Sequence, residues 1–334
     1  MGKKNGSGAG AYVALAVSAL FVAGCALAFW FVATGRLKAS GRQAEPAATA
    51  ADPAGTGVPA PKAFSEYSWD ELSQIARMIS AAADDAAGLE VAREYGIVGA
   101  DGAIADCVRP IELTDGHVVT CRVVGARADE LADGSGKAGL TFMTSPLSRR
   151  GMNDEDTNLG GWESSRLRAW LAADSLALLP QELSSGVVEV SKTTNNTGSV
   201  KGGDFDVLTS TADKLWAFSA SEVYGDVTWF AQEYGDKPIA NTGYVDFAPY
   251  DRLLCSEGAQ YAYFAEQGVR DRASFSALEG AVGSMGGNWW LRTPYPASLV
   301  GVEDSCFYQV MASGYPSTVL RASEENGVVA GFCL

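Results

Sequence analysis

The first pattern in the chain is an uncharged apolar run at residues 11–34, AYVALAVSALFVAGCALAFWFVAT. As a helix rising about 1.5 Å per residue, this run would span roughly 35 Å, which exceeds the ~30 Å hydrocarbon core of a bilayer. Basic residues flank it, with Lys3 and Lys4 before the run and Arg36 and Lys38 after it. The length and the flanking charges predict a transmembrane helix rather than a buried core helix.

Two kinds of membrane attachment are consistent with this run. Val22 to Cys25 resembles a bacterial lipobox, in which Cys25 would carry a lipid. However, the residues after Cys25 stay apolar, and the run is longer than the core of a cleavable signal. We therefore favour an uncleaved signal anchor: residues 1–10 form a cytoplasmic tail, the chain crosses the cytoplasmic membrane once, and the C-terminal part is extracellular.

Residues 35–63 are rich in Ala, Pro, Gly and Thr, so we expect a flexible linker. A short helical neck is predicted over residues 64–98. Ser68 and Glu71 have capping-box spacing, and apolar residues then recur at helical intervals. A second helix is expected from Asp85 to Tyr95, capped by Gly96.

Strand patterns follow the neck. Residues 108–113 and 117–124 flank Thr114-Asp115-Gly116, which predicts a hairpin because Asp-Gly supplies the positive φ of a tight turn. His117, the one histidine, is expected to be exposed at this turn. Cys107 and Cys121 lie on the two arms and are candidates for a disulfide, although spacing alone does not establish the geometry that a disulfide requires.

The segment GGWESSRLRAWL, residues 160–171, predicts a short amphipathic helix. Gly160 and Gly161 allow a turn, Ser164 or Ser165 can cap the helix, and an i, i+4 leucine pair gives it an apolar face. A further helix is expected at residues 176–185, and a second capping box at Ser219 to Glu222.

Residues 225–255 are aromatic and lack a regular period, which predicts a long structured loop. Such loops often carry recognition, so their aromatic residues are candidates for contacts with a ligand. These candidates are Trp229, Tyr234, Tyr244 and Tyr250. NWWLRTP, CFYQVMASG and NGVVAGFCL are expected to form the last strands of a mixed sheet.

Charge and composition narrow the functional classes. The chain has 25 basic and 40 acidic residues, and five of the basic residues precede Gln43. The remainder is strongly acidic, which argues against nucleic-acid binding. With one histidine, most catalytic triads and zinc sites are improbable. Gly134 to Lys137 lacks the context of a phosphate loop, and Asp154 to Asp156 lacks EF-hand spacing, so we expect no cofactor and no metal.

Several ordered motifs resemble the DUF 6273 family of bacterial proteins, a domain of unknown function. They are DGHVVTCRVVG, LADGSGKAGLTFM, GGWESSRLRAWL, LLPQELSSGVVEVSKTTNN, TADKLWAFSASEVYG, EGAQYAYF, WWLRTP and GVVAGFCL. The match covers residues 99–334 and places family positions at Gly160, Gly161, Trp162, Ser165, Arg168, Leu171, Trp290, Leu291, Arg292 and Pro294. This chain has Thr293 where the family usually has Ser, and Ala330 where it often has Pro.

A weaker similarity to C-type-lectin-like and formylglycine-generating-enzyme domains implies an α+β fold, with a C-type-lectin-like mixed sheet and two packed helices after the transmembrane helix and neck. The first functional hypothesis is a surface-anchored binding module for a glycan or protein, without catalysis. Arg168 and Arg292 are expected to pair with carboxylates rather than to bind ligand.

The alternative is a copper-dependent oxidase that uses Cys306 and Cys333, which the lectin-like similarity would place on neighbouring strands. A structural disulfide between these two cysteines is favoured over that use, because an extracytoplasmic location is oxidising. Cys255 would then remain unpaired.

Overall fold

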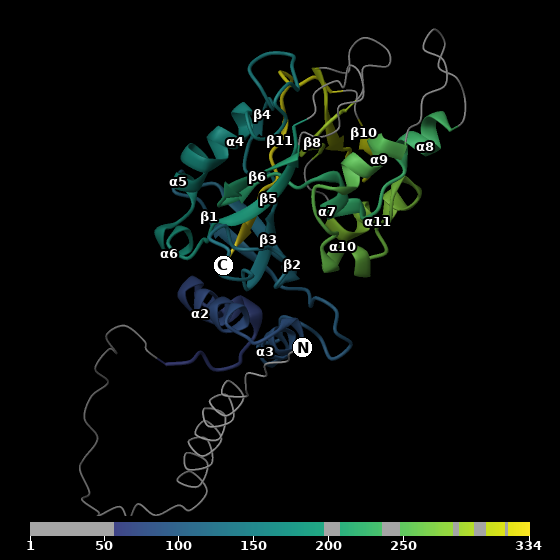
Figure 1. The fold of residues 1–334 in the computed structure, drawn as a ribbon. Coiled ribbons are helices and arrows are strands. Elements are labelled where there is room, and N and C mark those ends of the chain that lie inside the picture. Colours follow the sequence, from purple (N-terminus) through teal and green to yellow (C-terminus); the bar gives the residue numbers. More distant parts are fainter. Residues whose placement is uncertain (1–56, 197–207, 236–247, 283–286, 297–304, 318–319) are drawn as a thin grey trace, which may run out of the picture. The chain divides into compact units, whose positions relative to one another are not determined.

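A computed structural model describes residues 57–196, 208–235, 248–282, 287–296, 305–317 and 320–334 (Figure 1). These residues belong to one compact unit, Gly57–Leu334. The predicted tail and membrane segment, and the linker up to residue 56, lie outside the described residues. Among the residues that are described, no helix is both long and apolar enough to cross a membrane. Helices and several sheets confirm the α+β prediction.

The unit begins with a helical pair. Ser68 starts the main helix as predicted: its hydroxyl accepts a hydrogen bond from the Glu71 amide at 3.1 Å, and the Glu71 carboxylate accepts one from the Ser68 amide at 2.7 Å. Two of the orphan amides of the first turn are thereby satisfied. The elements are η1 (Phe64–Glu66), α2 (Trp69–Ser80) and α3 (Asp85–Glu94).

The helical pair packs on the first β-sheet. Trp69 of α2 meets Phe142 edge to face, with 6.1 Å between the ring centroids. Arg127 closes the other end of the helix, because its guanidinium donates to the carbonyls of Ile79 and Ser80 at 2.8 and 2.7 Å. These carbonyls belong to the last turn, which has no intrahelical donors for them. The neck helices therefore share their core with the sheet.

The first sheet has five antiparallel strands in the order β1-β2-β3-β12-β7. The predicted hairpin is confirmed, and Gly116 adopts a φ of +87° in its turn. His117 is exposed beside Asp115, also as predicted. The strands are β1 (Val108–Glu112), β2 (Val118–Ala126), β3 (Leu140–Thr144), β7 (Leu215–Trp216) and β12 (Gly331–Cys333).

The second sheet is mixed, with the order β10-β9-β8-β11-β4. Strand β11 runs parallel to β8, and the other pairs are antiparallel. The strands are β4 (Arg149–Arg150), β8 (Trp289–Pro294), β9 (Phe307–Val310), β10 (Pro316–Ser317) and β11 (Asn326–Gly327). The last predicted strand is thus divided, because β11 belongs to this sheet and β12 to the first.

A separate two-stranded ribbon consists of β5 (Val190–Asn195) and β6 (Leu208–Asp213). Val188, two residues before β5, forms an isolated bridge with Cys333 of the first sheet. The ribbon brings the side chains of β5 close to the helices that follow it.

The remaining helices are short. Where a loop was predicted for residues 225–255, the described part contains helices α8 and α9, so that prediction is wrong for these residues. The helices are α4 (Arg166–Trp170), η2 (Leu171–Ser175), α5 (Leu176–Leu178), α6 (Gln181–Ser184), α7 (Ala220–Tyr224), α8 (Trp229–Tyr234), α9 (Ala248–Cys255), α10 (Ala262–Glu266), η3 (Arg272–Ser274) and α11 (Phe275–Val282).

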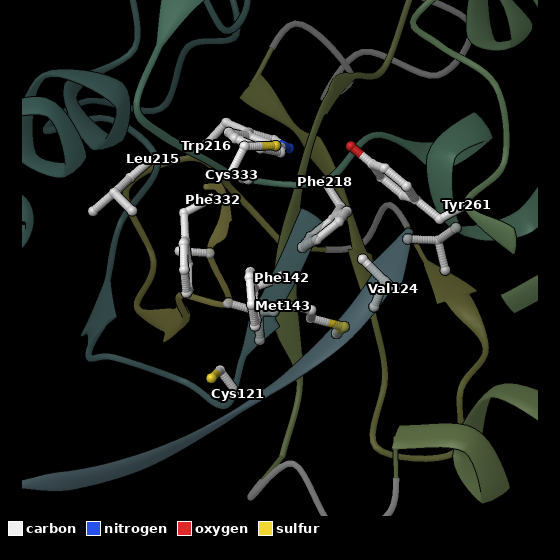
Figure 2. Close-up of a cluster of buried hydrophobic side chains, with 14 of the residues drawn as sticks. Cys121, Val124, Phe142, Met143, Leu215, Trp216, Phe218, Tyr261, Phe332 and Cys333 are labelled. Carbon is white, nitrogen blue, oxygen red and sulfur yellow. The ribbon is translucent and has the colours of Figure 1, made fainter. Parts of the chain in front are cut away.

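Aromatic side chains fill the core behind the first sheet (Figure 2). Phe142 of β3 stacks on Phe332 of β12 with 4.9 Å between ring centroids. Phe218 meets Tyr261 edge to face at 5.5 Å and so links the sheet to α10. All four rings are at most 3% exposed. Because these rings are buried and closely packed, they hold in place the strands and helices that carry the surface sites.

Candidate functional site

The helix motif at residues 160–171 forms part of the scaffold. Gly161 has a φ of +53° and faces the backbone of Asn195, which leaves no room for a side chain. Ser165 caps α4, since its hydroxyl accepts a hydrogen bond from the Arg168 amide at 3.1 Å. Arg168 then reaches Asp213 on β6, with Nε 2.7 Å from a carboxylate oxygen. The prediction that Arg168 pairs with a carboxylate is confirmed.

The same helix borders a groove with a volume of about 680 Å³. Arg149 and Arg150 of strand β4 form the opposite wall. Strand β4 and helix α4 lie near each other in the ribbon view (Figure 1). Both walls are anchored. The Trp290 indole donates to the Arg150 carbonyl at 2.8 Å, and the Arg166 amide donates to the Asn153 side chain at 3.0 Å. The groove is therefore built by segments that hold each other in place.

Three arginines line this groove. The Arg150 guanidinium lies 4.3 Å from the centroid of the Trp170 ring, which is a cation–π stack. Arg149 donates to the Glu325 carbonyl at 3.0 Å, and Arg166 is 3.5 Å from the carboxylate of Asp154. Within the described residues, neither Arg149 nor Arg150 has a carboxylate at ion-pair distance. Their side chains retain free hydrogen-bond donors that face the groove.

The rest of the lining is polar and small. Asp174, Glu325 and Ser323 supply acceptors, and Ala169 and Ala173 expose a methyl-sized surface along the helix. The positively and negatively charged side chains that line the groove are equal in number. Such a surface can form directed hydrogen bonds with a polar ligand, and its described lining contains no histidine, cysteine or lysine.

A second cluster of charges lies inside the protein. Lys192 of β5 contacts Asp129 at 2.7 Å and also contacts Glu222 of α7, which pairs with Arg292 of β8. Burial alone would raise the pKa of Glu222, but the charges of Arg292 and Lys192 outweigh it and hold the pKa below its ordinary value. These side chains are at most 5% exposed, so the cluster is closed to ligands in this structure.

Glu257 adjoins this cluster and differs from its neighbours in protonation. Its carboxylate accepts hydrogen bonds from the Asn195 amide, at 3.0 Å, and from the Thr293 hydroxyl. Burial raises the pKa of Glu257 to about 7, because the charge of Arg292 offsets the lost hydration only in part. Glu257 therefore titrates near neutral pH while remaining inside the fold.

Two of the four predicted loop aromatics are buried rather than exposed. Trp229 is 1% exposed and packs against Tyr224 at 5.4 Å, and Tyr250 is 9% exposed and stacks on Phe230. The prediction is wrong for these two residues, because helices α8 and α9 turn their rings into the core. The side chain of Tyr234 and all of Tyr244 lie outside the described residues.

The predicted disulfides are also contradicted. Cys107, Cys121, Cys255 and Cys333 are free thiols. In the hairpin, Cys121 lies opposite Arg109, while the Cys107 carbonyl accepts a hydrogen bond from Val123, so the two cysteines are out of register. Cys333 lies in strand β12 of the first sheet. Cys306 lies next to the second sheet, where its backbone forms an isolated β-bridge with Arg321. Contrary to expectation, Cys306 and Cys333 therefore do not lie on neighbouring strands of one sheet. No group of three metal-ligating side chains occurs within the described ranges.

The sequence did not predict that the residues around Arg149 and Arg150 form a groove. Arg149 and Arg150 are consecutive arginines in an acidic chain, and this doublet was the available signal. It did not reveal a site, because the opposite wall comes from residues 166–174 and the rim from residues 323–325.

Comparisons with known proteins give one match. No curated protein and no solved structure matches the chain. The family model of a domain of unknown function, DUF6273, matches residues 137–334, which include both walls of the groove and the buried Glu222–Arg292 pair. The matched segment is more than half of the 334 residues. The chain therefore belongs to the DUF6273 family.

Proposed function

We propose that this protein is a cell-surface-anchored binding module whose DUF6273 domain presents a lectin-like surface to a glycan or protein ligand. The groove between α4 and β4 is the binding site in this proposal. Residues 11–34 hold the chain in the bacterial cytoplasmic membrane, and the domain lies outside the cell.

The groove is the observation that carries the proposal. Its volume of about 680 Å³ is within the range of roughly 300–1,000 Å³ that is common for ligand sites. Its guanidinium, carboxylate and amide groups are planar and can form paired hydrogen bonds with vicinal hydroxyls. Trp170 and the stacked Arg150 add a flat surface next to them. These groups favour recognition of a polar ligand over a chemical reaction.

The organisation of the chain supports display at the surface. Residues 35–63 are poor in large apolar side chains, which is typical of a spacer between a membrane segment and a domain. In this proposal the spacer leaves the groove accessible outside the cell. The excess of acidic residues beyond Gln43 argues against a nucleic acid as the ligand.

Two alanine positions on the helix provide a matched test. Ala172 and Ala173 are both exposed in η2, but only Ala173 lines the groove. An Ala173→Trp variant of the full chain, in detergent micelles, should fill the groove, while Ala172→Trp makes the same change outside it. On a glycan array, we expect Ala173→Trp to weaken each hit at least about tenfold and Ala172→Trp to leave it within about twofold. Equal binding by both variants would rule out the groove.

The proposed orientation can be tested on intact cells. A membrane-impermeant amine reagent should label Lys62, which is partly exposed at the start of the described unit. Lys3 and Lys4 should be protected, because they lie in the predicted cytoplasmic tail. The reverse labelling pattern would show that the domain faces the cytoplasm.

A further inference from the structure

We infer that the groove binds an acidic glycan, whose sugar carboxylate is held by Arg149 and Arg150. This inference rests on the proposed function and adds the chemical class of the ligand. It is drawn from the state of the arginines in the groove rather than from its size.

Several exposed arginines lack a carboxylate partner in the described part of the chain, and Arg149 and Arg150 differ from the others in lying side by side along the groove. Beyond Gln43 the chain has 40 acidic and 20 basic residues, so carboxylates outnumber the cations with which they could pair. Buried cations such as Arg292 and Lys192 have such partners. Arg149 and Arg150 are adjacent and both exposed, yet in the described part of the chain neither is paired with a carboxylate. An external anion would complete their coordination.

The geometry of Arg150 prepares it for a carboxylate. Its guanidinium is stacked at 4.3 Å on Trp170, which is only 9% exposed and therefore held firmly in the core. This contact restrains the guanidinium, whose N–H groups have no carboxylate at ion-pair distance in the described residues. A planar fork of this kind matches the two oxygens of a carboxylate, and less ordering entropy is lost on binding.

The acidic side chains of the groove limit what else the ligand can be. Asp154 is engaged with Arg166, whereas Asp174 and Glu325 add negative charge to the wall and the rim. A polyanion without hydroxyl groups would be repelled by these carboxylates. A polyuronate has hydroxyl groups beside the carboxylate of each sugar, and those hydroxyls can donate to Asp174 and Glu325. The mixture of charges therefore favours an acidic glycan.

The test compares a polyuronate with its carboxyl-reduced form of the same chain length, using the full chain in detergent micelles. We expect reduction to weaken binding roughly tenfold to hundredfold, the usual effect of losing a charge-assisted bidentate contact. Arg150→Gln should cause a loss of similar size, and Arg149→Gln a smaller one. Arg150→Lys should restore only part of the affinity, because it keeps the charge without the fork. Arg252→Gln, an exposed arginine of α9 outside the groove, is the matched control and should bind normally.

The outcomes separate this inference from the proposed function. If the native and reduced glycans bind equally and Ala173→Trp blocks both, the groove is a glycan site but the carboxylate inference is wrong. If poly-glutamate binds as tightly as the polyuronate, the site recognises charge without sugar, and the assignment of a glycan is overturned. If no glycan binds, this inference fails and the proposed function loses its glycan ligand.

Discussion

Arg292 of β8 and Glu222 of α7 form a bidentate ion pair inside the protein, with Nη2 and Oε1 3.1 Å apart and both side chains at most 2% exposed. Glu222 also accepts a hydrogen bond from the Ser219 amide at 2.9 Å and so closes the capping box of its helix. One carboxylate thereby joins the start of a helix to the centre of the second sheet. Lys192 contacts the same carboxylate from the ribbon.

Removing the charge of Glu222 should destabilise the fold severely. Glu222→Gln leaves Arg292 and Lys192 buried without their shared anion, and breaking a buried pair in this way typically costs about 3–5 kcal/mol. The free energy of unfolding can be measured by chemical denaturation. Asp156→Asn, which removes the exposed partner of Arg321, is the matched control and should have a far smaller effect. Equal losses in the two variants would contradict this role.

Glu257 should make stability depend on pH near neutrality. Its pKa is raised by burial from 4.5 to about 7, so between these values the folded protein keeps a proton that the unfolded chain has lost. Stability should therefore be greatest below pH 4.5 as far as this group is concerned, and fall by about 3 kcal/mol as the pH rises to 7. The pKa values of Asp129 and Glu222 are lowered instead, so their effects belong to more acidic conditions.

The Glu257→Gln variant isolates this effect, because glutamine approximates the protonated acid at every pH. Denaturation between pH 5 and 8 should show a falling stability for the wild-type protein and a much flatter profile for the variant. If both profiles have the same slope, another group is responsible for the titration.

Trp229 should contribute to stability rather than to ligand contact. It is 1% exposed and lies between Tyr224 and Tyr308, with ring centroids 5.4 and 4.8 Å away. Trp229→Ala removes a large buried side chain and should cost about 3–5 kcal/mol in the free energy of unfolding. Trp229→Phe keeps an aromatic ring and should cost less. A Trp229→Ala variant that folds normally but loses ligand binding would restore the original loop hypothesis.

The cysteines should behave as protected thiols. Burial raises the pKa of both Cys107 and Cys121 to about 12, so little thiolate forms in the folded protein. Cys255 is only partly buried and should react first with a thiol reagent, as peptide mass spectrometry can show. In denaturant, Cys107 and Cys121 should become reactive without any reductant. A requirement for reductant would reveal the disulfide that the structure does not contain.

Local features of the fold were predictable from sequence. Capping at Ser68 and Ser219, and the turn at Gly116, depend on residues within four positions of one another, and the structure confirms all three. The helix at residues 229–234 was missed because its rings are buried by the surrounding aromatic core, which the local sequence does not indicate. The helix at residues 248–255 does have a periodic buried face, formed by Tyr250, Leu253 and Leu254, but the aromatic, glycine-containing sequence around it led to the prediction of a loop.

The candidate site could not be predicted in the same way. Arg168 and Arg292 were expected to have carboxylate partners, and they do, but nothing local indicated that these would be Asp213 and Glu222. The groove requires β4 and α4 to meet across a loop, with a rim from near the end of the chain. Such a juxtaposition arises from the order of strands in the second sheet, which hydrophobic patterning does not encode.

Hydrogen exchange of the full chain, with and without the polyuronate, tests the ligand site most directly. Ligand binding should slow exchange in peptides that cover residues 149–154 and 166–174, the two walls of the groove. Residues 229–235 and 248–255, which contain the buried Trp229 and Tyr250, should be unaffected. Protection confined to the latter segments, or an unchanged groove in the presence of bound ligand, would contradict the assignment.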